Sequence, residues 1–282
     1  MRFVATLLMW VVTTVLLAVA LPAAWVQQHL VDEDGYAALA QKAAADPALQ
    51  SAMATELTMQ AVKLGTRVDS GLVSGIAATY TASSAFPGQF AQANRFAHRW
   101  LFTDAIRSSV DPQGRWVIDF APMLSDTAFK QTLSEFNVTV PSSIPIPLTD
   151  NAPAVLRPGK LRVAATWGPW VSVGVTVLAG VCALLTLAVA GSRGKALAAL
   201  GVSALLVGAA GWAAIEFGQR YLNDALNNTS GDIRRVADAM VGAAENSMHQ
   251  WLNVSLVVGG GLVVIGVIVT LLGGLAKSTQ RG

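Results

Sequence analysis

The sequence predicts a mainly α membrane protein, with four transmembrane helices and a mostly helical α+β extracytoplasmic domain. The chain is 53% hydrophobic and only 13% charged, whereas soluble domains carry roughly 25% charged residues. Four apolar stretches contain no charged residue, and each reaches the ~20 residues that a helix needs to cross ~30 Å of hydrocarbon. Five of the eight tryptophans lie at the ends of these stretches that would share one membrane face.

The apolar stretches, the first of which begins at Phe3, predict transmembrane helices at 1–25, 167–190, 196–215 and 251–275. For the first, a cleaved signal peptide is the alternative. Its apolar core is longer than the roughly 7–15 residues of a signal peptide, and residues 21–24 offer no small-residue cleavage site, which favours an uncleaved anchor. Glycines in the fourth stretch, such as Gly266, give it small surfaces for close helix packing.

Basic residues predict the orientation. Five lie in the short segments at 1–2, 191–195 and 276–282, which contain no acidic residue: Arg2, Arg193, Lys195, Lys277 and Arg281. The positive-inside rule places such segments in the cytoplasm. We therefore expect a multi-pass protein of the cell membrane with both termini cytoplasmic and with 26–166 and 216–250 outside.

Membrane lipids are the first expected partner. Indole rings favour the headgroup layer, where the ring is buried and the N–H stays hydrated. The tryptophans expected at this lipid interface are Trp25, Trp167, Trp170, Trp212 and Trp251. Arg157, Lys160 and Arg162 precede the second stretch, where they would contact lipid phosphates or extend their side chains to water past the helix end.

The extracytoplasmic domain, 26–166, is predicted to begin with helices. Asp46 and Pro47 have the residue order of a helix N-terminus, and a longer helix is predicted from Phe86 to Val110. Alternating apolar residues then predict strands at 116–120 and 144–148, with a short helix between them. Strand, helix and strand in this order predict a parallel β-α-β unit.

The second outer segment, 216–250, is predicted to extend the third and fourth transmembrane helices as a helical hairpin. A polar break at 227–231 precedes a helix that starts at Asp232 and runs to Trp251. Val236 and Met240 belong to its apolar face, which needs a partner. We expect this face to pack on the helices of the extracytoplasmic domain.

Three polar residues form a candidate ligand site in the extracytoplasmic domain. Asn94 and His98 lie four residues apart on the predicted helix and share a face, with Arg95 beside them. Such a group suits an anionic headgroup or a peptide carboxylate. The alternative is that these residues are buried hydrogen-bonding groups or surface charges.

Signatures of other functions are missing. The three histidines lack the spacing of metal ligands, and no phosphate-binding loop or nucleophile motif is present. We therefore expect no catalytic residue, no metal and no cofactor. The net charge of +2 follows from topology, so nucleic acid is not an expected partner. The apolar stretches contain no ionisable residue and no inverted repeat, which argues against transport.

Several short segments resemble a group of actinobacterial, mycobacterial-type integral membrane proteins. These proteins are multi-pass and carry a large extracytoplasmic domain after the first transmembrane helix. The likeness rests on 31–36, 46–50, 93–98, 117–120 and Ile144-Pro145. It implies a cell-envelope protein and assigns no activity.

Together these features favour a non-enzymatic envelope protein, an accessory or scaffolding component that engages a partner membrane complex or an envelope lipid. The alternative is a sensor whose extracytoplasmic domain binds a ligand and acts through the third and fourth transmembrane helices. A membrane hydrolase that uses His98 is the least favoured class.

Overall fold

The computed structural model describes residues 2–63, 70–103, 108–110, 116–119, 145–147, 159, 161–226 and 231–279. The chain divides into two compact units. The bundle unit consists of Met1–Gln27, Pro169–Leu226 and Glu245–Gly282. The second unit consists of Gln28–Gly168 and Asn227–Ala244.

Among the described residues, four helices are long and apolar enough to cross a membrane. They are α1 (Arg2–Val26), α8 (Arg162–Val189), α9 (Arg193–Leu226) and α10 (Gly231–Thr279). The predicted four transmembrane helices are thus confirmed, and the chain is a multi-pass membrane protein. α9 and α10 run well beyond their apolar stretches, and α10 is one continuous helix of 49 residues.

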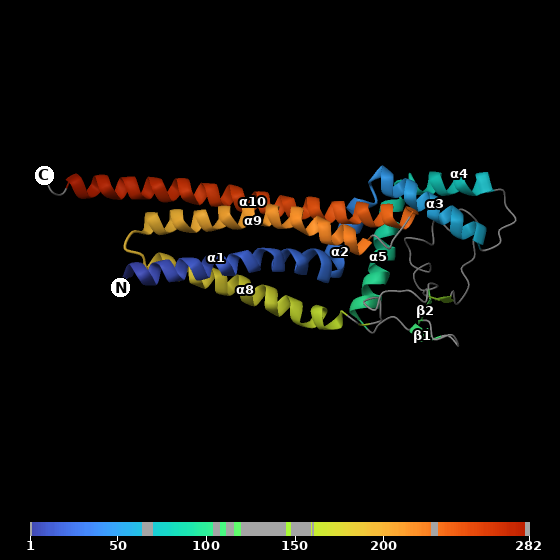
Figure 1. Ribbon diagram of the computed structural model, residues 1–282, viewed down its shortest axis with the longest axis horizontal. Coiled ribbons are helices and arrows are strands. Elements are labelled where there is room, and N and C mark those ends of the chain that lie inside the picture. The colour runs from blue at the N-terminus through green and yellow to red at the C-terminus, as the bar shows by residue number, and fades with distance from the viewer. Residues whose placement is uncertain are drawn as a thin grey trace. The chain divides into compact units, whose positions relative to one another are not determined.

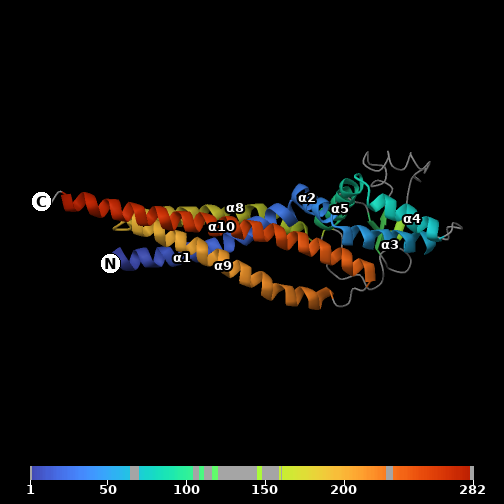
Figure 2. The same ribbon diagram turned by 90° about the horizontal axis from the view of Figure 1, so that it is seen from above.

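In the bundle unit, the four helices lie side by side (Figures 1 and 2). The start of α1, the end of α10 and the connection from α8 to α9 lie at the same end of this unit (Figure 1). Trp10 on α1 donates a hydrogen bond to the Ala199 carbonyl of α9 at 2.8 Å. Polar contacts of this kind are favourable between helices in an apolar surrounding, where water cannot replace them.

α9 and α10 pack with their backbones in close contact. A Cβ atom added to Gly201 would lie 2.6 Å from the Gly259 carbonyl oxygen, and one added to Gly266 would lie 2.6 Å from the Gly194 carbonyl oxygen. Only glycine permits this approach. The glycines therefore fix the spacing of this helix pair.

The second unit is built mainly from short helices. After the π-helical turn η1 (Gln27–Val31) come α2 (Glu33–Ala43), α3 (Pro47–Lys63), α4 (Ser70–Thr81) and α5 (Phe86–Phe102). The Asp46 carboxylate accepts a hydrogen bond from the Ala48 N–H at 2.7 Å. This contact, with Pro47 at the first helical position, explains where α3 starts.

The core of the second unit lies where α2, α3, α5 and the first turns of α10 meet. Its buried residues are Ala43, Ala44, Leu49 and Phe86. Val236 and Met240 of α10 pack against them. The apolar face of this segment thus packs within the chain, as the sequence predicted.

The predicted α+β domain is wrong. The described strands are only three, four and three residues long: β1 (Ser108–Val110), β2 (Trp116–Asp119) and β3 (Pro145–Pro147). The other elements of the described chain are helices. β2 pairs antiparallel with both β1 and β3, whereas a β-α-β unit requires parallel strands. Alternation of apolar residues indicates a strand but contains no information about its neighbour's direction.

The helix predicted from Phe86 to Val110 is also shorter than expected. α5 ends at Phe102, where Thr103 adopts extended backbone angles and its hydroxyl donates to the Arg99 carbonyl at 2.7 Å. Residues 108–110 form β1 instead of the last helical turn. The helix predicted between the two strands falls on residues outside the described ranges.

Candidate functional site

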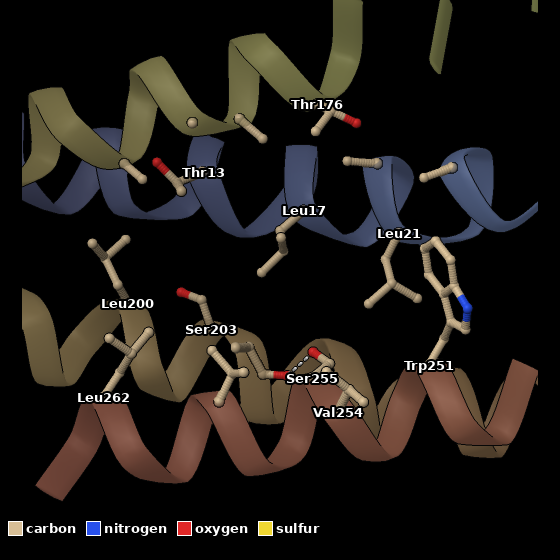
Figure 3. Close-up of a pocket in the computed structure, with 17 residues that line it drawn as sticks. Thr13, Leu17, Leu21, Thr176, Leu200, Ser203, Trp251, Val254, Ser255 and Leu262 are labelled. Atoms are coloured by element: carbon tan, nitrogen blue, oxygen red, sulfur yellow. Dashed lines mark hydrogen bonds between the residues drawn. The ribbon is translucent and has the colours of Figure 1, made fainter. Parts of the chain in front are cut away.

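A partly open cavity of about 690 Å³ lies between the four long helices of the bundle unit (Figure 3). α1 contributes Leu17 and Leu21 to its lining, and α10 contributes Val254 and Leu262. α8 contributes smaller residues, among them Gly180. The volume lies within the range of roughly 300–1,000 Å³ that is usual for small-molecule sites.

The cavity lining offers few hydrogen bonds to an occupant. The hydroxyls of Thr13, Thr176 and Ser203 donate to carbonyls four residues earlier on their own helices, at 2.7, 2.8 and 3.2 Å. Ser255 donates to the Ala204 carbonyl at 3.2 Å. Ordered water in a cavity needs two to four polar partners, so the lining suits an apolar occupant.

One end of the cavity, the hydroxyl end, is bordered by contacts between helices. The Thr13 and Thr186 hydroxyls, both on buried side chains, lie 3.4 Å apart and connect α1 with α8. The Thr14 and Ser203 hydroxyls lie 2.7 Å apart and connect α1 with α9. These contacts fill the bundle where the cavity stops.

The opposite end, the tryptophan end, is bordered by Trp251 (Figure 3). Trp25 donates to the Ser247 hydroxyl at 3.2 Å. Trp212 stacks on His249 with ring centroids 3.8 Å apart. Residues 247–251 of α10 span only ~6 Å along the helix, so indoles from α1, α9 and α10 gather at one level.

The cavity is about half as long as a membrane-spanning helix. It extends along α1 from Thr13 to Ala24 and along α10 from Leu262 to Trp251. Eleven helical steps of 1.5 Å correspond to ~16 Å. The hydrocarbon core of a bilayer is ~30 Å thick, so the cavity has the length of one leaflet.

The residues predicted at the lipid interface occupy different environments. Trp167 and Trp170 on α8 are 63% and 75% exposed. Trp25 is only 7% exposed, in contrast to its predicted surface position, because its indole packs inside and its N–H bonds to Ser247. Trp212 is partly exposed and also donates to Asn253.

Of the three basic residues of the predicted interface, the structure describes only Arg162. Arg162 is the first residue of α8. Arg157 and Lys160 lie outside the described residues. The structure therefore places one of the three in the first turn of a membrane-crossing helix.

The predicted polar group on α5 contacts α2 and η1. The Asn94 side-chain oxygen accepts a hydrogen bond from the Tyr36 hydroxyl at 3.2 Å. Arg95 forms ion pairs with Asp34 and, at 3.7 Å, with Glu33. These side chains hold two helices together, and neither lines the cavity.

His98, the third predicted ligand residue, is buried beside aromatic rings. Its Nε2 lies 3.1 Å from the Leu30 carbonyl oxygen, and its ring stacks on Phe102 with centroids 4.1 Å apart. The Tyr36 ring lies 5.4 Å away. The Nδ1 atom is buried and has no hydrogen-bond partner among the described residues.

Ion pairs at the contact between α2 and α5 shift the pKa of one carboxyl group. Arg99 donates to Glu33 from Nε and Nη2, at 2.8 and 2.7 Å. These bonds, together with the charges of Arg99, Arg95 and His98, lower the pKa of Glu33, although partial burial opposes the shift. Burial alone raises the pKa of Tyr36.

The cavity is the feature that sequence reasoning missed. A signal was present, because Thr176, Gly180 and Ala183 put small side chains on one face of α8 opposite the leucines of α1. Small residues at this spacing, however, also occur where two helices touch. Sequence alone does not distinguish these two arrangements.

Within the described residues, no group of three or more histidine, cysteine, aspartate or glutamate side chains is placed to hold a metal ion. Comparison of the chain with known protein families, with curated proteins and with solved structures found no match.

Proposed function

We propose that the protein is a non-enzymatic membrane component of the cell envelope that binds a membrane lipid by inserting one acyl chain into the bundle cavity. The observation that carries the proposal is the cavity itself, which is apolar, lies between four membrane-crossing helices and has the length of one leaflet. Bound lipid would make the protein an accessory factor that presents or stabilises that lipid beside a partner membrane complex.

An acyl chain suits the cavity better than a partner helix does. A transmembrane helix needs a groove along the full ~30 Å of hydrocarbon, whereas the cavity ends at the Thr13–Thr186 contact after ~16 Å. Trp251 borders the other end, and an indole favours the headgroup layer. A lipid with its headgroup near Trp251 and its chain directed toward Thr13 satisfies both ends.

The proposal includes an orientation. Arg193 and Lys195 lie in the first turn of α9, at the end of the bundle unit where α1 starts. The positive-inside rule puts this end in the cytoplasm. The tryptophan end then faces outward, and the bound chain belongs to a lipid of the outer leaflet.

Purification from native membranes in mild detergent, followed by mass spectrometry of the retained molecules, tests the proposal. We expect lipid at close to one molecule per protein. Purified protein without lipid, but with a stoichiometric protein partner, would replace this proposal with a role as a purely protein-binding subunit.

A further inference from the structure

We infer that the hydroxyl end of the cavity limits the length of the bound acyl chain, so that the protein selects lipids by chain length. This inference rests on the proposed function and adds a specificity to it. Two observations carry it: contacts between helices border one end of the cavity, and an interfacial indole borders the other.

Contacts among three helices hold the hydroxyl end in place. The Thr13–Thr186 contact ties α1 to α8, and the Thr14–Ser203 contact at 2.7 Å ties α1 to α9. Thr13, Thr186 and Ser203 are buried. Each also bonds to a carbonyl of its own helix, so a chain terminus that reaches them gains no contact by displacing them.

Three side chains determine where a bound chain would stop. Figure 3 shows Leu200 of α9 and Leu262 of α10 at the end of the cavity near Thr13. On α8, Ala183 lines the cavity three residues before Thr186. The volumes of these three side chains therefore set the depth of the cavity.

The tryptophan end fixes the position at which the acyl chain enters the cavity. Trp251 borders the tryptophan end, and the headgroup of a bound lipid cannot follow its chain into an apolar cavity without losing hydration. A chain that is too short leaves unfilled space and loses dispersion contacts with the lining. A chain that is too long has to fold back or leave the cavity.

The experiment uses the full-length protein in vesicles of phosphatidylglycerols that differ only in acyl-chain length. After mild detergent extraction, mass spectrometry compares the chain lengths of retained and total lipid. Leu262→Ala deepens the cavity and Ala183→Leu shortens it. Leu271→Ala, at an exposed position on the same helix as Leu262, is the matched control.

We expect the wild-type protein to retain a narrower range of chain lengths than the vesicles contain. Leu262→Ala should raise the mean retained length by about two carbon atoms, because truncation to alanine leaves space that a longer chain fills. Ala183→Leu should lower it by a similar amount, and Leu271→Ala should leave it unchanged.

The two proposals fail in different ways. If the wild-type protein retains lipid, but its chain lengths match those of the vesicles and neither cavity variant shifts them, the length selection is overturned and the lipid site stands. If the wild-type protein retains no lipid at all, the proposed function fails and the length selection fails with it.

Discussion

At the scale of single residues, the contact between α2 and α5 depends on a small charged network. Glu33 accepts two hydrogen bonds from Arg99 and lies 3.7 Å from Arg95. The Glu33 and Arg99 side chains are 30% and 47% exposed. At such exposure water screens the charges, so a pair of this kind contributes about 0.5–1 kcal/mol.

This network predicts a pH-dependent stability. The pKa of Glu33 lies below its ordinary value of 4.5, so the folded state favours the ionised form. Its contribution is therefore present above about pH 4.5 and is lost as the pH falls through the lowered pKa. Glu33→Gln should reduce the thermal unfolding temperature at pH 7 and have less effect in acid.

The measurement is the thermal unfolding temperature in detergent, at pH 7 and in acid. Glu56→Gln is the control, because Glu56 bonds to Gln60 on its own helix and joins no two helices. An equal loss of stability for Glu33→Gln at pH 7 and in acid would contradict the account.

Sequence reasoning at this scale identified the residues but not their partners. The spacing of Asn94 and His98 placed them on one face of a helix, and both contact Tyr36 in the structure. Tyr36 is 58 residues from Asn94. Periodicity reports which residues share a face, and it contains no information about which distant residue that face meets.

At the scale of elements, a repeat of glycines shapes the α9–α10 pair. α9 has glycines at 194, 201 and 208, and α10 has them at 259 and 266. A seven-residue spacing keeps small residues on one side of two helices that cross at a shallow angle. Gly194 meets Gly266 and Gly201 meets Gly259.

Gly201→Ala is therefore expected to destabilise the bundle. Its Cβ would lie 2.6 Å from the Gly259 carbonyl oxygen, and such overpacking costs about 1–3 kcal/mol. Gly260→Ala is the control, because a Cβ there meets nothing within 4 Å. Unfolding by sodium dodecyl sulfate should occur at lower detergent fraction for Gly201→Ala, and equal midpoints for the two variants would refute this packing.

Elements differed in how well the sequence predicted them. The membrane-crossing helices followed from long apolar stretches, because hydrophobic length is a property of the local sequence. The sheet was mispredicted, because β2 and β3 pair antiparallel and the alternation that indicates a strand does not give its direction relative to a neighbour. The early end of α5 depends on the extended backbone of Thr103.

At the scale of the whole molecule, the proposed function predicts which segments of the chain are accessible from outside the cell. Cys182 is buried and is the only cysteine, so Cys182→Ala gives a cysteine-free background. In that background, Thr55→Cys should react with a membrane-impermeant maleimide on intact cells. Gly191→Cys, between α8 and α9, should react only after lysis, and the reverse pattern would overturn the orientation.

The cavity also belongs to this scale, because it exists only when four helices come together. Leu17 and Leu262 would look the same in sequence if they packed on a neighbouring helix. Their face was therefore predictable as apolar, but the space in front of it was not. The structure shows that space, and the proposed function rests on it.

The measurement that tests the lipid site most directly is photolabelling in vesicles of phosphatidylglycerol that carries a diazirine in its acyl chain. Wild type is compared with two α8 variants, Gly180→Leu and Gly174→Leu. A Cβ at either glycine meets nothing within 4 Å, so both variants should fold. Only Gly180 lines the cavity.

We predict that peptides containing Leu17, Leu21 and Val254 are labelled in the wild-type protein and in Gly174→Leu, and that Gly180→Leu loses most of this label because its side chain fills the cavity. Equal labelling of these peptides in all three proteins, or label confined to outward residues such as Val257, would contradict an acyl chain in the bundle.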